Sequence, residues 1–259
     1  MVRHLHDAPD VGRVLGLLSV YLQPDGHGRI LGVPAALTKR CPYLFEGLLR
    51  GHALVFVKRI WTDLHARRAD VRRDDLFLTT KILPEHFSPE AFIAAADASL
   101  KRLGTDYVDL LLLHWPSKEV PIAETIGALN DLISAGKVRH GGVSNFTMDM
   151  VDQAQAALNT PLAANQIELH PLIDQTRMIA HLASKGIPVE AYSPLAQGKV
   201  MKNAMLREIA AVHYASPAQI ALAWVLTRPM SIALPRTGNK NRLADNLGAA
   251  DIMLSAEEI

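Results

Sequence analysis

The segment YVDLLLLHW (residues 107–115) is an apolar run that ends abruptly in a histidine and a tryptophan. Its length and its successive leucines predict a strand that is buried on both faces. Before it, residues 89–103 carry apolar side chains at helical spacing, namely Phe92, Ala96, Leu100 and Leu103. We expect Ser88 to cap this helix, Pro89 to occupy its first position and Gly104 to end it.

The same alternation of strand and helix extends outward in both directions. The other strand-like segments are LFLTTK (76–81), GGVSN (141–145), AANQIEL (163–169), IPVEAYSPL (187–195) and SIALPRTG (231–238). The other expected helices are a stripe from Ile122 to Ile133 closed by Gly136, a segment through Met148, Val151 and Leu158, residues 174–185 before Gly186, residues 205–228 with a restart at Ser216-Pro217, and an Asn-rich start after 238. Near-continuous apolar strands joined by helices predict an α/β fold with a parallel sheet covered on both faces.

Six such units occupy residues 76–259 of the chain. A closed (β/α)8 TIM barrel needs two more units, and residues 1–75 have about the right length to supply them. Within that region, ALVFVKRI (53–60) is a candidate strand. Barrels of this size are ordinarily one domain, so we predict a single domain over residues 1–259.

Composition excludes several classes of protein. The formal net charge of +1 gives no general attraction to nucleic acid or to anionic membranes. No apolar run reaches the roughly 18 residues that a membrane span requires, and the initial MVRHLHDAPD lacks the apolar stretch of a signal peptide. The single cysteine, Cys41, excludes an internal disulfide and suits a reducing compartment. We therefore expect a cytoplasmic protein.

Polar residues stand at or just after the carboxyl end of each expected strand. They are Lys81, His114 with Trp115, Ser144 with Asn145, Gln166 with Glu168, Tyr192 with Ser193, and Arg236 with Thr237. Each has an ordinary structural explanation: the lysine could be solvated, the histidine could be a hydrogen-bonded structural residue, and Ser144-Asn145 could cap the next helix. Because the carboxyl ends of barrel strands meet at one mouth, their joint placement predicts a polar pocket there.

In these segments the sequence resembles the aldo-keto reductase family. DDLFLTTK, LGTDYVDLLLLHWP, GKVRHGGVSNF, NQIELHP, AYSPLAQGK and LPRTGNKNRLADNL occur in family order over about residues 71–259. The wording of HWP, NQIELHP and AYSPLAQG is most similar to the prokaryotic branch that includes 2,5-diketo-gluconate reductases. The resemblance implies a monomeric (β/α)8 barrel that binds NADPH without a Rossmann fold, requires no metal and reduces small aldehydes, ketones or keto-sugars. The absence of G-x-G-x-x-G after any expected strand agrees with this.

The resemblance also implies roles for individual residues. Lys81 and His114 would be catalytic, and Trp115 would line the substrate pocket. At the nicotinamide, the resemblance implies that Ser144, Asn145 and Gln166 bind the carboxamide and that Tyr192 stacks on the ring. Along the pyrophosphate it implies Ser193, Leu195 and Gln197. At the adenosine end it implies Asp245 and Asn246 at the adenine, and at the 2′-phosphate Arg236, Thr237, Gly238, Asn239 and Arg242. The 2′-phosphate assignment has independent support, because two arginines and a hydroxyl beside a helix N-terminus suit a dianionic phosphate.

The first seventy residues depart from the family pattern. The family's proton-donating tyrosine and its lysine-pairing aspartate would lie before Lys81, yet RGHALVFVKRIWTDLHARRAD (50–70) contains no tyrosine, and its acids Asp63 and Asp70 lack the family's neighbours. Tyr21 and Tyr43 lie too far upstream to be assigned by motif. Either this region has truly diverged, or about 15–70 is read in a wrong frame, which translation of the other two frames would decide.

Three functions are therefore compatible with the sequence. The chain could be an NADPH-dependent carbonyl reductase, a catalytically impaired family member that still binds NADPH, or a defective product with neither property. A divergent enzyme could also use His114 as the proton donor, since imidazole titrates near neutral pH.

Overall fold

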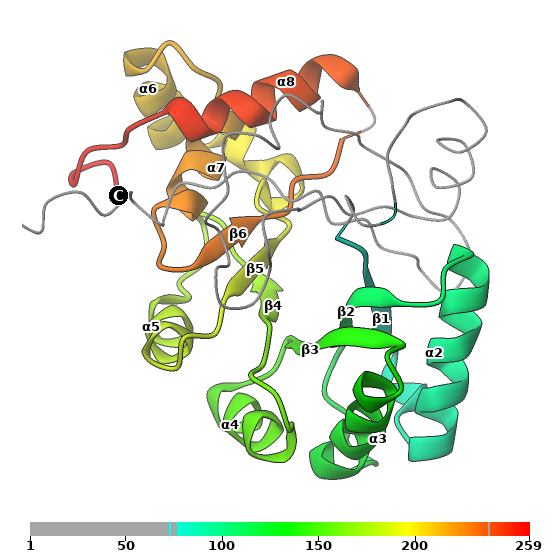
Figure 1. Ribbon diagram of the computed structural model, residues 1–259. Coiled ribbons are helices and arrows are strands. Elements are labelled where there is room, and N and C mark those ends of the chain that lie inside the picture. Colours follow the sequence, from blue (N-terminus) through cyan, green and yellow to red (C-terminus); the bar gives the residue numbers. More distant parts are fainter. Residues whose placement is uncertain (1–72, 74–76, 238) are drawn as a thin grey trace, which may run out of the picture.

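Six parallel strands form one sheet in which the spatial order follows the chain, β1-β2-β3-β4-β5-β6 (Figure 1). The computed structural model describes residues 73, 77–237 and 239–259. The strands are β1 (Thr79–Ile82), β2 (Val108–Leu113), β3 (Val138–Ser144), β4 (Asn165–Glu168), β5 (Val189–Tyr192) and β6 (Ser231–Ala233). The predicted α/β alternation and parallel sheet are confirmed. The two further barrel units, and every prediction made for residues 1–70 and for Gly238, lie outside the described residues.

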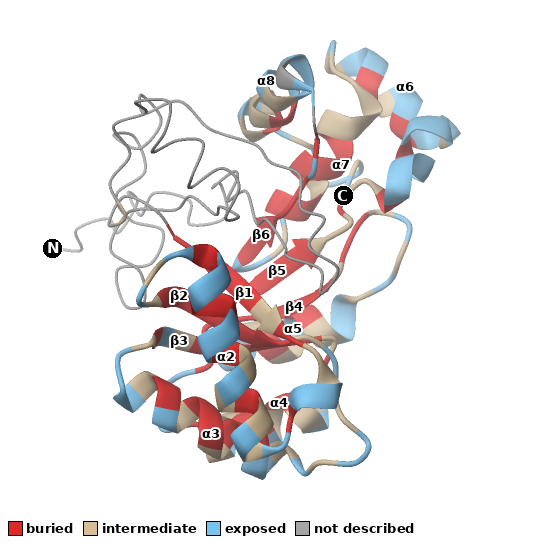
Figure 2. Ribbon diagram, turned by 90° about the vertical axis from the view of Figure 1, so that its right-hand side faces the viewer, coloured by how far each residue is buried: buried red, intermediate tan, exposed pale blue. Residues whose placement is uncertain are grey.

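Helices connect successive strands. They are α2 (Pro89–Leu103), α3 (Ile122–Ser134), α4 (Met148–Ala157), α5 (Thr176–Ser184), α6 (Ala204–Val212), α7 (Pro217–Leu226) and α8 (Lys240–Gly248), with the short 3₁₀ turns η2 (Pro84–His86), η3 (Ala196–Lys202) and η4 (Ala249–Asp251). The strands are largely buried, whereas α2, α3 and α6 carry exposed residues on their outer faces (Figure 2). The amphipathic helices α2 to α5 thus cover one face of the sheet, as their sequence periodicity predicted, whereas α6 packs against α7 and η3 in a separate apolar cluster.

Local signals determine several helix ends. Pro89 begins α2 and Gly104 ends it with φ +67°, and Ser88 occupies the predicted N-cap position. Its side chain makes no capping hydrogen bond, but its backbone carbonyl accepts the first helical bond from Phe92 N at 2.8 Å. The predicted restart at Ser216 is confirmed, because Ser216 and Gln219 form a reciprocal capping box.

Two strands differ from the prediction, and the sixth is shorter because a backbone N–H donor is missing after it. The sixth strand was predicted over 231–238, but β6 ends at Ala233. Leu234 N still donates to Ala191 O at 3.0 Å, whereas Pro235 has no N–H and cannot continue the ladder. The first strand is also displaced, since β1 covers Thr79–Ile82 rather than 76–81.

The two faces of the sheet have different roles. Alternate strand residues point to opposite faces, and Leu111, Leu113, Val143 and Ala191 belong to the hydrophobic core that the helices complete. On the alternate positions, parallel register places Ser144 opposite Gln166 and Gln166 opposite Glu190. The inner face therefore carries the polar chemistry and the outer face carries the packing.

A glycine on β3 allows close packing at this inner face. A Cβ at Gly142 would lie 2.6 Å from Leu112 Cδ2 and 3.0 Å from the backbone oxygen of Ala164. We expect Gly142→Ala to lower the free energy of unfolding by about 1–3 kcal/mol, because the backbone oxygen cannot rotate away. Gly127→Ala in α3 is the matched control, since nothing lies within 4 Å of its Cβ and alanine favours a helix by up to ~1 kcal/mol. Urea unfolding of both variants measures the difference, and equal stabilities would contradict the packing argument.

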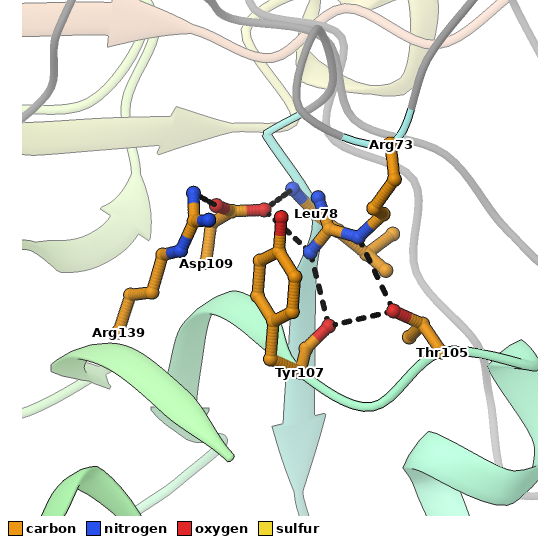
Figure 3. A network of polar contacts seen from close by, with 6 residues as sticks. All are labelled: Arg73, Leu78, Thr105, Tyr107, Asp109 and Arg139. Carbon is orange, nitrogen blue, oxygen red and sulfur yellow. Dashed lines mark hydrogen bonds and ion pairs between the residues drawn. The ribbon is translucent and has the colours of Figure 1, made fainter. Parts of the chain in front are cut away.

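Asp109 on β2 is the buried centre of an ionic cluster (Figure 3). The cluster lies at the opposite end of the sheet from the predicted pocket. Its carboxylate accepts from Arg73 at 2.8 Å, from Arg139 at 2.9 Å and from Leu78 N at 2.8 Å. The guanidinium carbons of Arg73 and Arg139 lie 3.9 and 4.1 Å from the Tyr107 ring centroid. The cluster lies where the strands begin, a position that contributes to stability in barrel folds.

Candidate active site

Lys81, Ser144 and Gln166, which the sequence placed on three different strands, meet at one end of the sheet. Lys81 Nζ donates to Gln166 Oε1 at 2.6 Å, and Ser144 Oγ donates to the Gln166 backbone oxygen at 3.0 Å. Ser144 and Gln166 are fully buried and Lys81 is half-buried. The predicted convergence of these polar residues is therefore observed among the described strands.

Asn145 connects this group to the neighbouring strands. It has φ +62°, a left-handed conformation that asparagine tolerates better than most residues. Its amide donates to His114 O and to Ser144 Oγ, both at 3.1 Å, and its oxygen accepts from Tyr192 OH at 2.9 Å. Neither Ser144 nor Asn145 caps α4, because Thr147 holds that position. The helix-cap explanation for this pair is therefore wrong.

Glu190 on β5 is the residue that sequence analysis missed. Gln166 Nε2 donates to Glu190 Oε2 at 2.5 Å, and the glutamate is only 6% exposed. The available signal was a charged residue within the otherwise apolar VEAY, two positions before Tyr192 and so on the same face of the strand. Burial of a carboxylate is costly unless it is paired, which marks it as part of the site.

Burial and neighbouring charges shift the pKa values of the site's titratable groups. Desolvation lowers the Lys81 pKa to about 7, although the Glu190 carboxylate opposes this shift. Burial raises the pKa of Glu190, with Gln166 and Lys81 acting in the opposite direction. Burial and the nearby Glu168 raise the Tyr192 pKa, so this phenol keeps its proton at neutral pH. Shifted groups gathered at one strand end indicate a functional site.

His114 follows β2 and stacks on Trp115, with ring centroids 6.4 Å apart and planes inclined by 26°. The Trp115 side chain is 46% exposed, so it stands at the open side of the site. Desolvation and the Lys81 charge lower the His114 pKa to about 4, and Glu85 opposes them. The imidazole is therefore neutral at pH 7. This argues against the hypothesis that His114 supplies the proton as an imidazolium.

The segment after β5 has an unusual backbone. Ser193, Ala196 and Gln197 have φ of +49°, +47° and +53°, and Gly198 follows with φ +91°. Residues other than glycine rarely adopt this conformation, and such strain concentrates at binding sites. Ser193 and Leu195 are partly buried and Gln197 is exposed, so the three predicted pyrophosphate-lining residues lie on one strained turn.

The predicted phosphate loop joins β6 to α8. Arg236, Arg242 and Asp245 are exposed, whereas Thr237 and Asn246 are buried. Thr237 Oγ1 accepts from Asn239 N at 3.1 Å, and Asn239 Oδ1 accepts from Asn241 N at 2.9 Å as the N-cap of α8. Thr237 and Asn239 thus shape the loop, while the two arginines remain exposed beside the helix start.

In the part of the chain that the structure describes, no group of three or more His, Cys, Asp or Glu side chains could hold a metal ion. No single described helix is long and apolar enough to cross a membrane, and α6 with α7 passes that test only as a pair bent by 88°.

Both the sequence and the fold of this chain are similar to those of known proteins. The model of the aldo/keto reductase family matches residues 50–259. Methylglyoxal reductase DkgB of Escherichia coli O157:H7 is 39% identical over 191 residues, which cover 73% of this chain and 71% of that protein. A crystal structure described as a candidate 2,5-diketo-D-gluconic acid reductase B has a TM-score of 0.73 at 39% identity, covering 79% of this chain and 74% of the other.

A third similarity concerns the cofactor. An aldo-keto reductase from Klebsiella pneumoniae in complex with NADPH has a TM-score of 0.66 at 33% identity, and the match covers 72% of this chain and 68% of that one. These similarities confirm the resemblance that the sequence motifs indicated, including its closeness to the 2,5-diketo-gluconate reductase branch.

Proposed function

Because the chain belongs to the aldo-keto reductase family, and so to oxidoreductases that use a nicotinamide cofactor, we propose that it reduces small aldehydes, ketones or keto-sugars to alcohols with NADPH. The observation that carries this proposal is a continuous chain of hydrogen bonds at one end of the sheet. In order, it connects Lys81, Gln166, Ser144, Asn145 and Tyr192. When bound, NADPH would supply the hydride. We further propose that residues 1–259 act as a single-domain, cytoplasmic monomer.

The hydrogen-bonding capacity that remains in the site suits a carboxamide. Both N–H groups of Asn145 are used, so its oxygen can accept one further bond but its amide cannot donate another. Toward the described residues, Gln166 uses one N–H and one lone pair of its side chain, which leaves one donor and one acceptor. The Ser144 hydroxyl donates to the Gln166 backbone and can still accept. A nicotinamide carboxamide has the complementary donors and acceptor.

Tyr192 would provide the surface on which the nicotinamide ring stacks. Its hydroxyl is anchored on Asn145, which fixes the orientation of the ring, and the side chain is only partly buried. Lys81 Nζ lies 5.9 Å from the ring centroid, so the cation and the stacking surface border the same space. Ser193, Leu195 and Gln197 on the strained turn would then follow the pyrophosphate.

Lys81 and His114 would act on the substrate's carbonyl oxygen. An ammonium with a pKa of about 7 is partly protonated at neutral pH, so it can stabilise developing negative charge on that oxygen and donate the proton that completes the alcohol. A neutral His114 imidazole can donate a hydrogen bond to the same oxygen and so orient the substrate. Trp115, exposed and stacked on His114, would line the substrate pocket.

Arg236 and Arg242 would bind the 2′-phosphate with Thr237, Gly238 and Asn239, while Asp245 and Asn246 would reach the adenine. Arg242 lies in the first turn of α8, and this turn contains no acidic residue. A cation at a helix N-terminus is unfavourable because that end of the helix dipole is already positive. A bound phosphate would offset the charge of Arg242 and the positive end of the dipole, which supports an anion at this position.

We expect Arg242→Ala to weaken NADPH binding by about tenfold while leaving NADH binding within about twofold, because only NADPH carries the 2′-phosphate. Fluorescence titration with each dinucleotide measures both affinities. Arg207→Ala, which removes an exposed arginine from α6, is the matched control. An equal loss for NADPH and NADH would place the phosphate elsewhere.

The proposed function is tested by NADPH oxidation with methylglyoxal and with other small aldehydes, ketones and keto-sugars. Turnover with any of these carbonyls supports the reductase function. A catalytically impaired NADPH-binding member is the second candidate, favoured by the absence of a tyrosine from residues 50–70. Tight NADPH binding without turnover of any carbonyl would establish that candidate, and failure to bind NADPH would exclude both.

A further inference from the structure

Glu190 and Lys81 contact opposite ends of one side-chain amide. Lys81 Nζ lies 2.6 Å from Gln166 Oε1, and Glu190 Oε2 lies 2.5 Å from Gln166 Nε2. Gln166 is fully buried and Glu190 is 6% exposed, so water does not screen the contact between these two side chains. β4 holds the amide at the register position directly opposite the glutamate on β5.

These contacts determine which way the amide faces. An ammonium group only donates hydrogen bonds, so it selects the oxygen of Gln166, and an ionised carboxylate only accepts, so it selects the nitrogen. The two neighbours therefore specify the same orientation, and rotation of the amide by 180° would lose both bonds. With Lys81 protonated and Glu190 ionised, each bond is charge-assisted, which makes it stronger than a bond between neutral groups.

We propose that Glu190 is a positioning residue that holds the Gln166 amide in the orientation required for the cofactor's carboxamide. This inference rests on the proposed function, because Gln166 is assigned to the nicotinamide there. With Oε1 committed to Lys81 and Nε2 to Glu190, the second lone pair and the second N–H of Gln166 have fixed directions. A carboxamide ligand then meets one donor and one acceptor in a single arrangement. Glu190 also supplies a buried negative charge beside the Lys81 ammonium.

Glu190→Gln tests this role, because it preserves the size of the side chain and removes its charge. The new amide can face Gln166 with either its oxygen or its nitrogen, so only Lys81 still selects the orientation of the Gln166 amide. We expect NADPH to bind about tenfold more weakly. Binding of 2′-phospho-ADP-ribose, which lacks the nicotinamide, is expected to stay within about twofold. Glu208→Gln on the exposed face of α6 is the matched control and should leave both affinities unchanged.

A second measurement reports on Lys81 without any cofactor. Among the described residues, the groups that act on its ammonium include Gln166 on β4, Glu190 on β5 and His114 after β2, with the Tyr192 ring 5.9 Å away. Because the Glu190 charge raises the Lys81 pKa, Glu190→Gln should lower it below its value of about 7. NMR titration of protein labelled with ¹³C at the lysine ε-carbons follows this change.

Selective loss of NADPH affinity together with a lower Lys81 pKa supports the positioning role. Equal losses for NADPH and the fragment would show general damage and would overturn it, and so would unchanged NADPH affinity. If the unmodified protein binds the fragment but binds NADPH no more tightly, the proposed nicotinamide site fails and the inference falls with it. In that case a lowered Lys81 pKa would still show that Glu190 and Lys81 are coupled, so the two failures are distinguishable.

Discussion

Asp109→Asn is expected to lower the free energy of unfolding by about 3–5 kcal/mol, which is a large part of the stability of an ordinary domain. The Asp109 side chain is 4% exposed and lies between Arg73 and Arg139, at 2.8 and 2.9 Å. Loss of its charge weakens both ion pairs of this buried carboxylate. It also weakens the hydrogen bond that the backbone N–H of Leu78, just before β1, donates to the Asp109 side chain. Urea unfolding followed by circular dichroism measures the change.

Asp97→Asn provides the matched control for this prediction. Asp97 pairs with Lys137 at 2.6 Å, which is shorter than either contact of Asp109, but both partners are substantially exposed. Exposed ion pairs contribute about 0–1 kcal/mol because water screens them and the side chains lose entropy. The two variants therefore compare burial at similar geometry. If Asp97→Asn destabilised the protein as much as Asp109→Asn, distance rather than burial would determine the effect.

The order of the elements could be predicted because strand and helix leave different periodicities in the sequence. The run of leucines in β2, the apolar stripe of α3 and glycines such as Gly104 and Gly186 were sufficient for that purpose. The residues at which strands end were harder to predict from the sequence. Pro235 lies within an apolar stretch that resembles a longer strand, and only the ladder of donors shows where β6 stops.

The candidate site was predictable wherever a polar residue closes an apolar strand. Glu190 escaped that rule because it lies inside its strand, and its meaning depends on Gln166 and Lys81, which are 24 and 109 residues away in the sequence. The charge state of His114 could not be predicted from the sequence either, since its pKa depends on burial and on the Lys81 charge in the folded protein. Sequence patterns indicate which residues meet, whereas protonation depends on the environment that the fold creates.

Lys81→Met is expected to reduce kcat/KM for carbonyl reduction by at least about 100-fold. The substitution keeps most of the side-chain volume and removes the cation that would stabilise the substrate's oxygen. Because the Lys81 pKa is about 7, the charged form is lost as pH rises through neutrality. The unmodified enzyme should therefore lose kcat/KM above about pH 7, and Lys81→Met should show no such decline. Initial rates with methylglyoxal between pH 5 and 9 measure both effects.

Lys101→Met on the exposed face of α2 makes the same chemical change away from the site and should leave the rate and its pH dependence unchanged. His114→Ala is expected to lower kcat/KM as well, but to keep the decline above about pH 7, since that decline belongs to Lys81 and the imidazole is already neutral there. Turnover that survived both Lys81→Met and His114→Ala would place the chemistry on other residues. A pH profile unchanged by Lys81→Met would assign the titrating group to another side chain of the site, even if the rate fell as expected.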